Sequence, residues 1–189
     1  MDEKEFRSKL IEWDAKSLDK RVERWKRLVP AAYHGRLPDL LWEYVTEVDD
    51  LYIRGHFIGV VLMCASILEL VLADQLKIKL KLTQEEVEQF RLEQMEILSH
   101  KLNLLNENEV QQAKGLRRLR NYLIHANAGK LNEMAKKKYK DWGIDVYKLD
   151  AGLFLSPPWE GEGGLDQEAL KYLTFTRNLT VRFYGAEEE

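Results

Sequence analysis

The sequence has little cysteine and no apolar stretch long enough to read plainly as a membrane span. Its 189 residues include one cysteine, Cys64, so an internal disulfide is excluded and a reducing cytoplasm is the expected compartment. Cys64 lies in an apolar run, which favours a buried structural thiol over a reactive one. The most apolar segment, residues 57–73, contains Ser66 and Glu69, so we expect a buried core helix and no membrane association. No apolar stretch follows the charged first residues, so we expect no signal peptide.

The chain also lacks a strong excess of either charge. The formal net charge of −3 excludes a strongly basic nucleic-acid binder. The charge is unevenly distributed, however, because residues 111–140 carry nine lysines and arginines against one glutamate. Such a segment favours an anionic partner such as RNA, and the alternative is a solvated lysine-rich helix surface.

Apolar periodicity predicts six main helices, so the fold class we expect is all-α. They span residues 5–28, 38–53, 55–82, 83–105, 109–126 and 166–183, and a further short basic helix is expected at 131–139. The third helix is apolar on nearly all sides, which is typical of the centre of a bundle. Thr83 and Glu86 form a capping-box pattern, and Asp166 is the expected N-cap of the last helix.

The segment from 141 to 164 differs from the rest, since it is rich in glycine and proline. We expect a loop or a small hairpin here, with residues 144–148 against 153–156. The sequence contains no internal repeat, so we predict a single domain over residues 1–189, an antiparallel helical bundle with this insertion and a C-terminal helix. We expect its tryptophans in the core; they are Trp13, Trp25, Trp42, Trp142 and Trp159.

Three polar residues near the end of the fifth predicted helix could carry chemistry. Asn121 and His125 are four residues apart, so they share one helix face. Arg120 and His125 are separated by about 140° around a regular helix, so they can border one cleft without both pointing straight into it. Symmetric dimerisation would bring two copies of the segment into one groove.

This segment resembles the Arg-polar-x-x-x-His signature of HEPN domains, with Arg120, Asn121 and His125 at the matching positions. The helix from Gly55 to Leu76 is similar to the long inner helix of that family, where an acidic residue such as Glu69 supports the motif. The resemblance covers about residues 39–127, and residues 129–189 form a C-terminal extension that it does not reach.

The resemblance implies a cytoplasmic, metal-independent endoribonuclease that needs no cofactor, acts as a homodimer and serves prokaryotic defence or stress. It would cleave single-stranded RNA through the 2′-OH and leave a 2′,3′-cyclic phosphate. His125 would be the general acid/base, Arg120 the phosphate clamp and Asn121 the orienting group. Further RNA contacts are expected from Lys114, Arg117 and Arg118. No close His, Cys or Asp spacing predicts a metal site.

Other interpretations of the same residues remain open. His125 could be a core or capping histidine, and Glu69 could form a purely structural tie to Arg120. The chain could equally be a non-catalytic module that binds RNA, a nucleotide or a protein, or a helical scaffold. In HEPN toxins, a tyrosine that the antitoxin modifies follows two positions after the histidine. Asn127 stands there in this chain, so control by an antitoxin or other protein regulator would take a different form.

Overall fold

The computed structural model describes residues 3–28, 37–125 and 164–185, and all regular structure within these ranges is α-helical. The helices are α1 (Glu3–Arg27), α2 (Asp39–Arg54), α3 (Phe57–Leu80), α4 (Gln84–Glu88), α5 (Leu92–Lys101), α6 (Glu107–His125) and α8 (Leu165–Tyr184). The predicted all-α bundle with a C-terminal helix is therefore confirmed. The short helix expected at 131–139 and the loop or hairpin at 141–164 lie outside the described residues.

The apolar helix α3 is the centre of the bundle. It contacts α2, α4, α5, α6 and α8, which explains why it carries apolar side chains on nearly all sides. Nine of its residues are buried, among them Cys64, as the sequence predicted. By length and composition α3 could also cross a membrane. However, α3 is surrounded by five other helices, as the core helix of a soluble protein is, and this position explains its apolar composition equally well.

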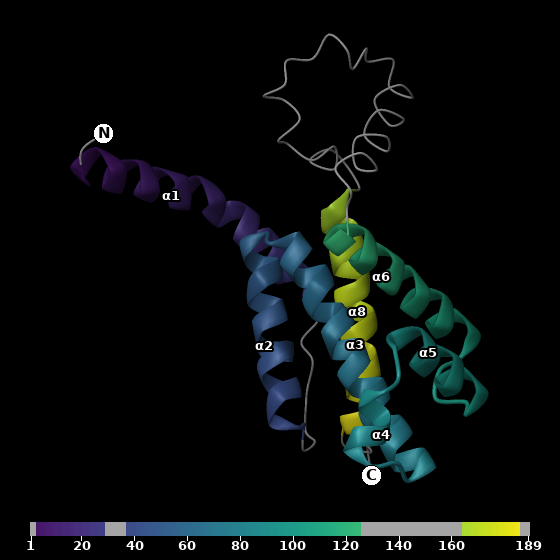
Figure 1. Ribbon diagram of the computed structural model, residues 1–189. Coiled ribbons are helices and arrows are strands. Elements are labelled where there is room, and N and C mark those ends of the chain that lie inside the picture. Colours follow the sequence, from purple (N-terminus) through teal and green to yellow (C-terminus); the bar gives the residue numbers. More distant parts are fainter. Residues whose placement is uncertain (1–2, 29–36, 126–163, 186–189) are drawn as a thin grey trace, which may run out of the picture.

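Figure 1 shows α3 and α8 side by side in the middle, α2 on one flank and α5 with α6 on the other. Helices α2 and α6 end at the same end of the bundle at which α3 and α8 begin. We call this the motif end, and it is marked by Arg54, Phe57, His125 and Leu165. Helix α1 ends against it, and the first part of α1 projects away from the bundle.

The turn between α2 and α3 depends on Gly55. This residue has φ +83°, a left-handed conformation, and its N–H donates to the carbonyl of Tyr52. A Cβ atom at this position would lie 2.7 Å from Nη1 of Arg24, so the missing side chain also lets α1 approach. Arg24 Nη1 in turn donates to the carbonyl of Ile53 at 3.2 Å. Gly55 thus positions three helices at the motif end.

The prediction of one helix over residues 83–105 was wrong. The chain leaves the helix after Glu88 and starts a new one at Leu92. Between them Arg91 is extended, with φ −79° and ψ 154°, and its backbone N–H donates to Oε1 of Gln94 at 2.8 Å. The glutamine side chain therefore satisfies a backbone donor at the start of the second helix, which makes the break stable.

The two N-cap predictions had different outcomes. The capping box is confirmed, since Thr83 and Glu86 exchange side-chain and backbone hydrogen bonds. The prediction that Asp166 caps the last helix was wrong, because the N-cap is Gly164 and Asp166 lies in the first turn. There its carboxylate is favoured by the helix dipole and accepts a hydrogen bond from Arg27 at 3.1 Å.

The expectation that the tryptophans are core residues was wrong for the two whose side chains are described. Trp25 is 63% exposed and Trp42 is 53% exposed. The bundle contacts the other face of α1, through Arg24 and Leu28, which leaves Trp25 on the outer face. The side chains of Trp13, Trp142 and Trp159 lie outside the described part of the chain.

Candidate functional site

The residues of the predicted motif lie in the last two turns of α6, at the motif end. Arg120 and Asn121 are both partly buried, and Arg120 Nη1 donates to Asn121 Oδ1 at 3.3 Å. His125 is the last residue of the helix, and its side chain lies outside the described part of the structure. The helix therefore brings the arginine and the amide together and ends at the histidine.

The guanidinium of Arg120 has no carboxylate partner in the described part of the chain. Glu69, the acidic residue expected to support the motif, is on α3 and only partly buried, and it forms no hydrogen bond or ion pair with Arg120 there. The structural tie between these two residues is thus not formed. Four of the five guanidinium N–H groups of Arg120 have no hydrogen-bond acceptor among the described residues.

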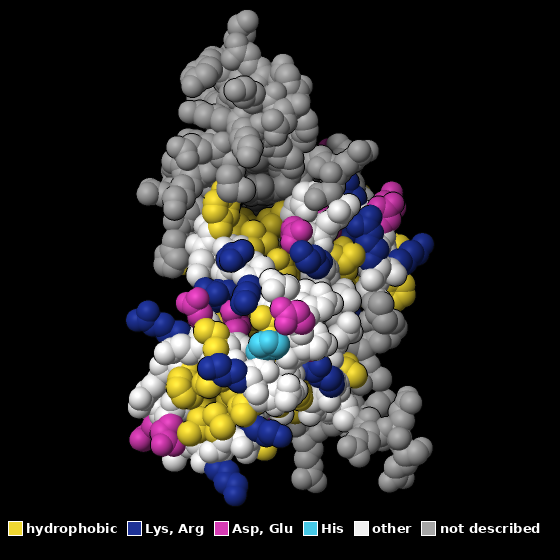
Figure 2. Space-filling view, turned by 90° about the vertical axis from the view of Figure 1, so that its right-hand side faces the viewer, with side chains coloured by type: hydrophobic (Ala, Val, Ile, Leu, Met, Phe, Trp, Pro, Cys, Tyr) yellow, Lys and Arg dark blue, Asp and Glu magenta, His cyan; other side chains and the backbone are white. Residues whose placement is uncertain are grey.

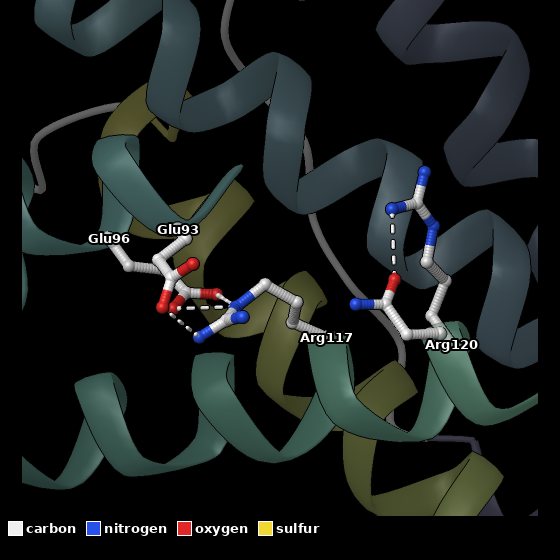
Figure 3. Close-up of polar contacts among 5 residues, drawn as sticks. Glu93, Glu96, Arg117 and Arg120 are labelled. Carbon is white, nitrogen blue, oxygen red and sulfur yellow. Dashed lines mark hydrogen bonds and ion pairs between the residues drawn. The ribbon is translucent and has the colours of Figure 1, made fainter. Parts of the chain in front are cut away.

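Arg117, one turn earlier on α6, has a different environment. Its Nε lies 3.1 Å from each carboxylate oxygen of Glu96, and its Nη2 lies 3.3 Å from Oε1 of Glu93. Figure 3 shows Arg117 turned toward both glutamates and Arg120 pointing away from them. The Glu96 side chain is 1% exposed and that of Arg117 is 19% exposed. Arg117 therefore ties α6 to α5, and its charge is already matched by two carboxylates.

Burial raises the pKa of the Glu96 carboxyl, while the nearby charges of Arg117 and Lys114 oppose this rise. Sequence reasoning missed Glu96. The sequence does contain a pattern that could have indicated this ion pair. Glu93 and Glu96 are three residues apart, as are Lys114 and Arg117, so two acidic and two basic side chains are equally spaced on α5 and α6. Of the three basic residues expected to contact RNA, Arg117 thus binds this acidic pair, and the charge of Lys114 acts on Glu96.

The third of these residues, Arg118, is exposed. The face of the molecule over α5 and α6 carries lysines and arginines interspersed with acidic and apolar side chains, and no continuous basic surface covers it (Figure 2). Contact with an anion on this face would therefore be local, at single exposed cations.

A cavity of about 760 Å³ opens at the motif end, between α1 and the first turns of α3 and α8. One wall carries Lys20, Glu23, Arg24 and Arg27 of α1, and the other consists of residues 55–59 with Leu165 and Asp166. The three cations are spaced four and three residues apart, so they share one face of α1. That spacing is visible in the sequence.

The start of α3 makes this cavity suited to an anion. No side chain caps α3 and its first turn has no acidic residue, so the N–H groups of Phe57, Ile58 and Gly59 face no described acceptor. Arg27 is paired with Asp166, whereas Lys20 is exposed. The cavity thus combines an open helix start with Lys20, which forms no ion pair with a described residue, and it also contains the carboxylate of Glu23.

Within the described residues, no group of three or more His, Cys, Asp or Glu side chains is arranged to hold a metal ion. No family model, no curated protein and no solved structure matches the chain.

Proposed function

We propose that this chain is a HEPN-type helical domain that binds single-stranded RNA at the motif end and cleaves it without a metal ion. The proposal rests on the hydrogen bonding and charge environment of Arg120. Its guanidinium is held by Asn121, has no carboxylate partner among the described residues and lies on the helix that ends at His125. An unmatched, partly buried arginine is costly unless an anion uses it, and a phosphodiester has the geometry to do so.

In the proposed reaction, Arg120 holds two non-bridging oxygens of a phosphodiester and stabilises the charge that develops there. The imidazole of His125 takes the proton of the adjacent ribose 2′-OH, because histidine exchanges protons near neutral pH. The 2′-oxygen attacks the phosphorus, and the bond to the 5′-oxygen breaks. The products are a 2′,3′-cyclic phosphate and a 5′-OH, and the leaving oxygen receives a proton. Asn121 positions Arg120 through their hydrogen bond.

The surroundings of the motif support an RNA substrate. Lys20 and the open start of α3 offer a place for a further phosphate at the motif end. The excess of positive charge over residues 111–140 continues beyond His125 into residues outside the described part. We also propose a cytoplasmic protein in which two copies share one groove at the motif end when RNA is bound. A protein regulator or antitoxin would act by covering that groove.

RNA binding without cleavage is the second candidate. The cavity at the motif end is a specific observation in its favour, since Lys20 and the N–H groups of α3 can hold a phosphate without any proton transfer. Binding and cleavage must therefore be measured separately.

The test uses a fluorescent single-stranded RNA in excess EDTA, with cleavage and affinity measured on the same preparations. The variants are Arg120→Ala and His125→Ala, and the matched control is Arg118→Ala, an exposed arginine of the same helix. We expect His125→Ala to lose about 10²- to 10⁴-fold in cleavage rate with little change in affinity. Arg120→Ala should lose cleavage and also affinity, and Arg118→Ala should stay within a few-fold of wild type in cleavage.

Cleavage that persists unchanged in both motif variants would contradict the nuclease proposal. Binding without cleavage by the wild type, weakened by Arg120→Ala, would select the second candidate. Thermal unfolding of each variant checks that the losses do not come from loss of the fold.

A further inference from the structure

Helix α1 carries an apolar stripe that the bundle does not cover. Ile11 is 71% exposed, Leu18 56%, Val22 41% and Trp25 63%. The side of α1 that contacts the bundle is a different one, since Arg24 binds the carbonyl of Ile53. Single apolar residues are normal on a protein surface, but four large apolar side chains on one face of a helix form a patch. Such a patch marks an interaction site.

The spacing of the stripe is that of a coiled coil. Ile11, Leu18 and Trp25 recur every seven residues, and Val22 lies four residues after Leu18. Ser8 and Ala15, both exposed, occupy the remaining positions of the same seam. We call these six residues the α1 stripe. Because large and small residues alternate along the stripe, their order determines which pairing of two helices fills the space between them.

We propose that the α1 stripe binds the α1 stripe of a second copy of this chain, with the two helices antiparallel. In the register that uses the whole stripe, Ala15 faces Leu18 of the other copy and Val22 faces Ile11. Trp25, the largest side chain, then faces Ser8, the smallest polar one. Every residue of the stripe has a partner, and each large side chain except Val22 meets a smaller one.

The charges beside the stripe favour this orientation over the parallel one. In the antiparallel register Asp14 lies beside Arg21 of the other copy, and the two-fold symmetry repeats this pair. Glu5 and Lys26 make a second attractive pair. One repulsive pair, Glu12 with Asp19, remains. Attractive contacts thus outnumber repulsive ones two to one.

In a parallel dimer the balance is reversed. Asp14 would face Asp19, and Arg21 would face Lys26, so two of the three kinds of flanking pair are repulsive. Only the pair of Arg7 with Glu12 would attract. Like charges at these positions select against an arrangement, which is how coiled coils choose their partners and orientation.

The occupant is a second copy because the stripe complements itself in shape and in charge. The stripe is only about 26 Å long at 1.5 Å per residue, so the contact alone is smaller than a standard interface and should dissociate on dilution. The proposal does not depend on RNA cleavage, because the stripe lies on a different face of α1 from Lys20, Arg24 and Arg27, which line the cavity at the motif end.

The first test is the mass of the full chain in solution, by light scattering, from about 1 to about 100 μM, where small interfaces dissociate. The wild type should approach twice its monomer mass of 22.2 kDa as the concentration rises. Leu18→Glu should remain a monomer throughout. The matched control is Ile78→Glu, since Ile78 is 65% exposed near the opposite end of α3, and this variant should behave as wild type.

The second test decides between contacts within one copy and contacts between two. Arg21 Nη2 bonds Asp14 Oδ1 of its own chain at 2.7 Å, so Asp14→Arg and Arg21→Asp both remove that internal bond. Each variant alone should dimerise at least several-fold more weakly than wild type. Mixing the two variants restores opposite charges only between antiparallel copies, so the mixture should regain the dimer.

Recovery in the mixture together with a monomeric Leu18→Glu supports the proposal. A wild-type chain that stays monomeric at all concentrations overturns it. So does a dimer that survives Leu18→Glu, because it would use another surface, or a mixture that dimerises no better than its components.

Discussion

Replacing Arg117 by alanine should destabilise the fold strongly, although the residue lies beside the motif. The substitution leaves the Glu96 carboxylate, 1% exposed, without the guanidinium that contacts both of its oxygens at 3.1 Å. Removing one partner of a buried ion pair costs about 3–5 kcal/mol, and the partial exposure of Arg117 favours the lower value. For a domain of this size, about 3 kcal/mol corresponds to roughly 6–12 °C in melting temperature.

The loss should also depend on pH. Burial holds the pKa of Glu96 above its usual range, so the stability gained from its neutral form is present at low pH and falls as pH rises through the folded-state pKa. Arg117 opposes that rise, so its removal moves the folded-state pKa further up. The penalty of Arg117→Ala is therefore largest at neutral pH and smaller as pH falls toward the ordinary glutamate pKa of about 4.3.

Urea unfolding at several pH values measures this effect. Arg118→Ala is the exposed control and should change stability by at most about 0.5 kcal/mol. The double variant Glu96→Leu with Arg117→Met removes both charges and should recover most of the loss. A penalty below about 1 kcal/mol at neutral pH, or one equal at all pH values, would refute the reasoning.

Three further predictions concern other parts of the bundle. Gly55→Ala should lower the unfolding free energy by about 1–2 kcal/mol from the left-handed backbone, and by more because Arg24 must move; denaturant unfolding checks this. Burial raises the pKa of the Cys64 thiol to about 12, so thiol reagents at pH 8 should label it only after unfolding, and rapid labelling of the native protein would contradict its burial. Tyr184→Phe removes a 2.6 Å hydrogen bond to Asp74 and should cost about 1.5–3 kcal/mol at pH 7. Burial raises the pKa of Tyr184, so the wild type should lose this advantage above about pH 10, and equal stabilities at pH 7 would count against the bond.

The helices and the central place of α3 could be predicted because they depend on local pattern. An all-round apolar helix can only be satisfied at the centre of a bundle, and Cys64 follows from the same pattern. The break before Leu92 was missed because it depends on one glutamine side chain reaching back to Arg91, which competes with a continuous helix by a small free energy. The spacing of apolar residues does not show whether the continuous helix or the capped break is more stable.

The environment of the motif was predicted less well, for a physical reason. Which arginine of α6 is neutralised depends on where α5 packs, and sequence distance does not show that Glu96 lies against Arg117 rather than Glu69 against Arg120. The exposure of Trp25 has the same origin, because composition does not show which face of α1 meets the bundle. The positions of the motif residues along α6 could be predicted, but the side chains on other helices that pair with the arginines of α6 could not.

The most direct test of the central claim is the fate of two RNAs of one sequence, unmodified and fully 2′-O-methylated, incubated with the wild-type chain in EDTA. If the 2′-oxygen is the nucleophile and no metal takes part, only the unmodified RNA is cut, and mass spectrometry finds 2′,3′-cyclic phosphate and 5′-OH ends. Cleavage of the methylated RNA, 5′-phosphate ends, or failure to cut the unmodified RNA would contradict a nuclease built on Arg120 and His125.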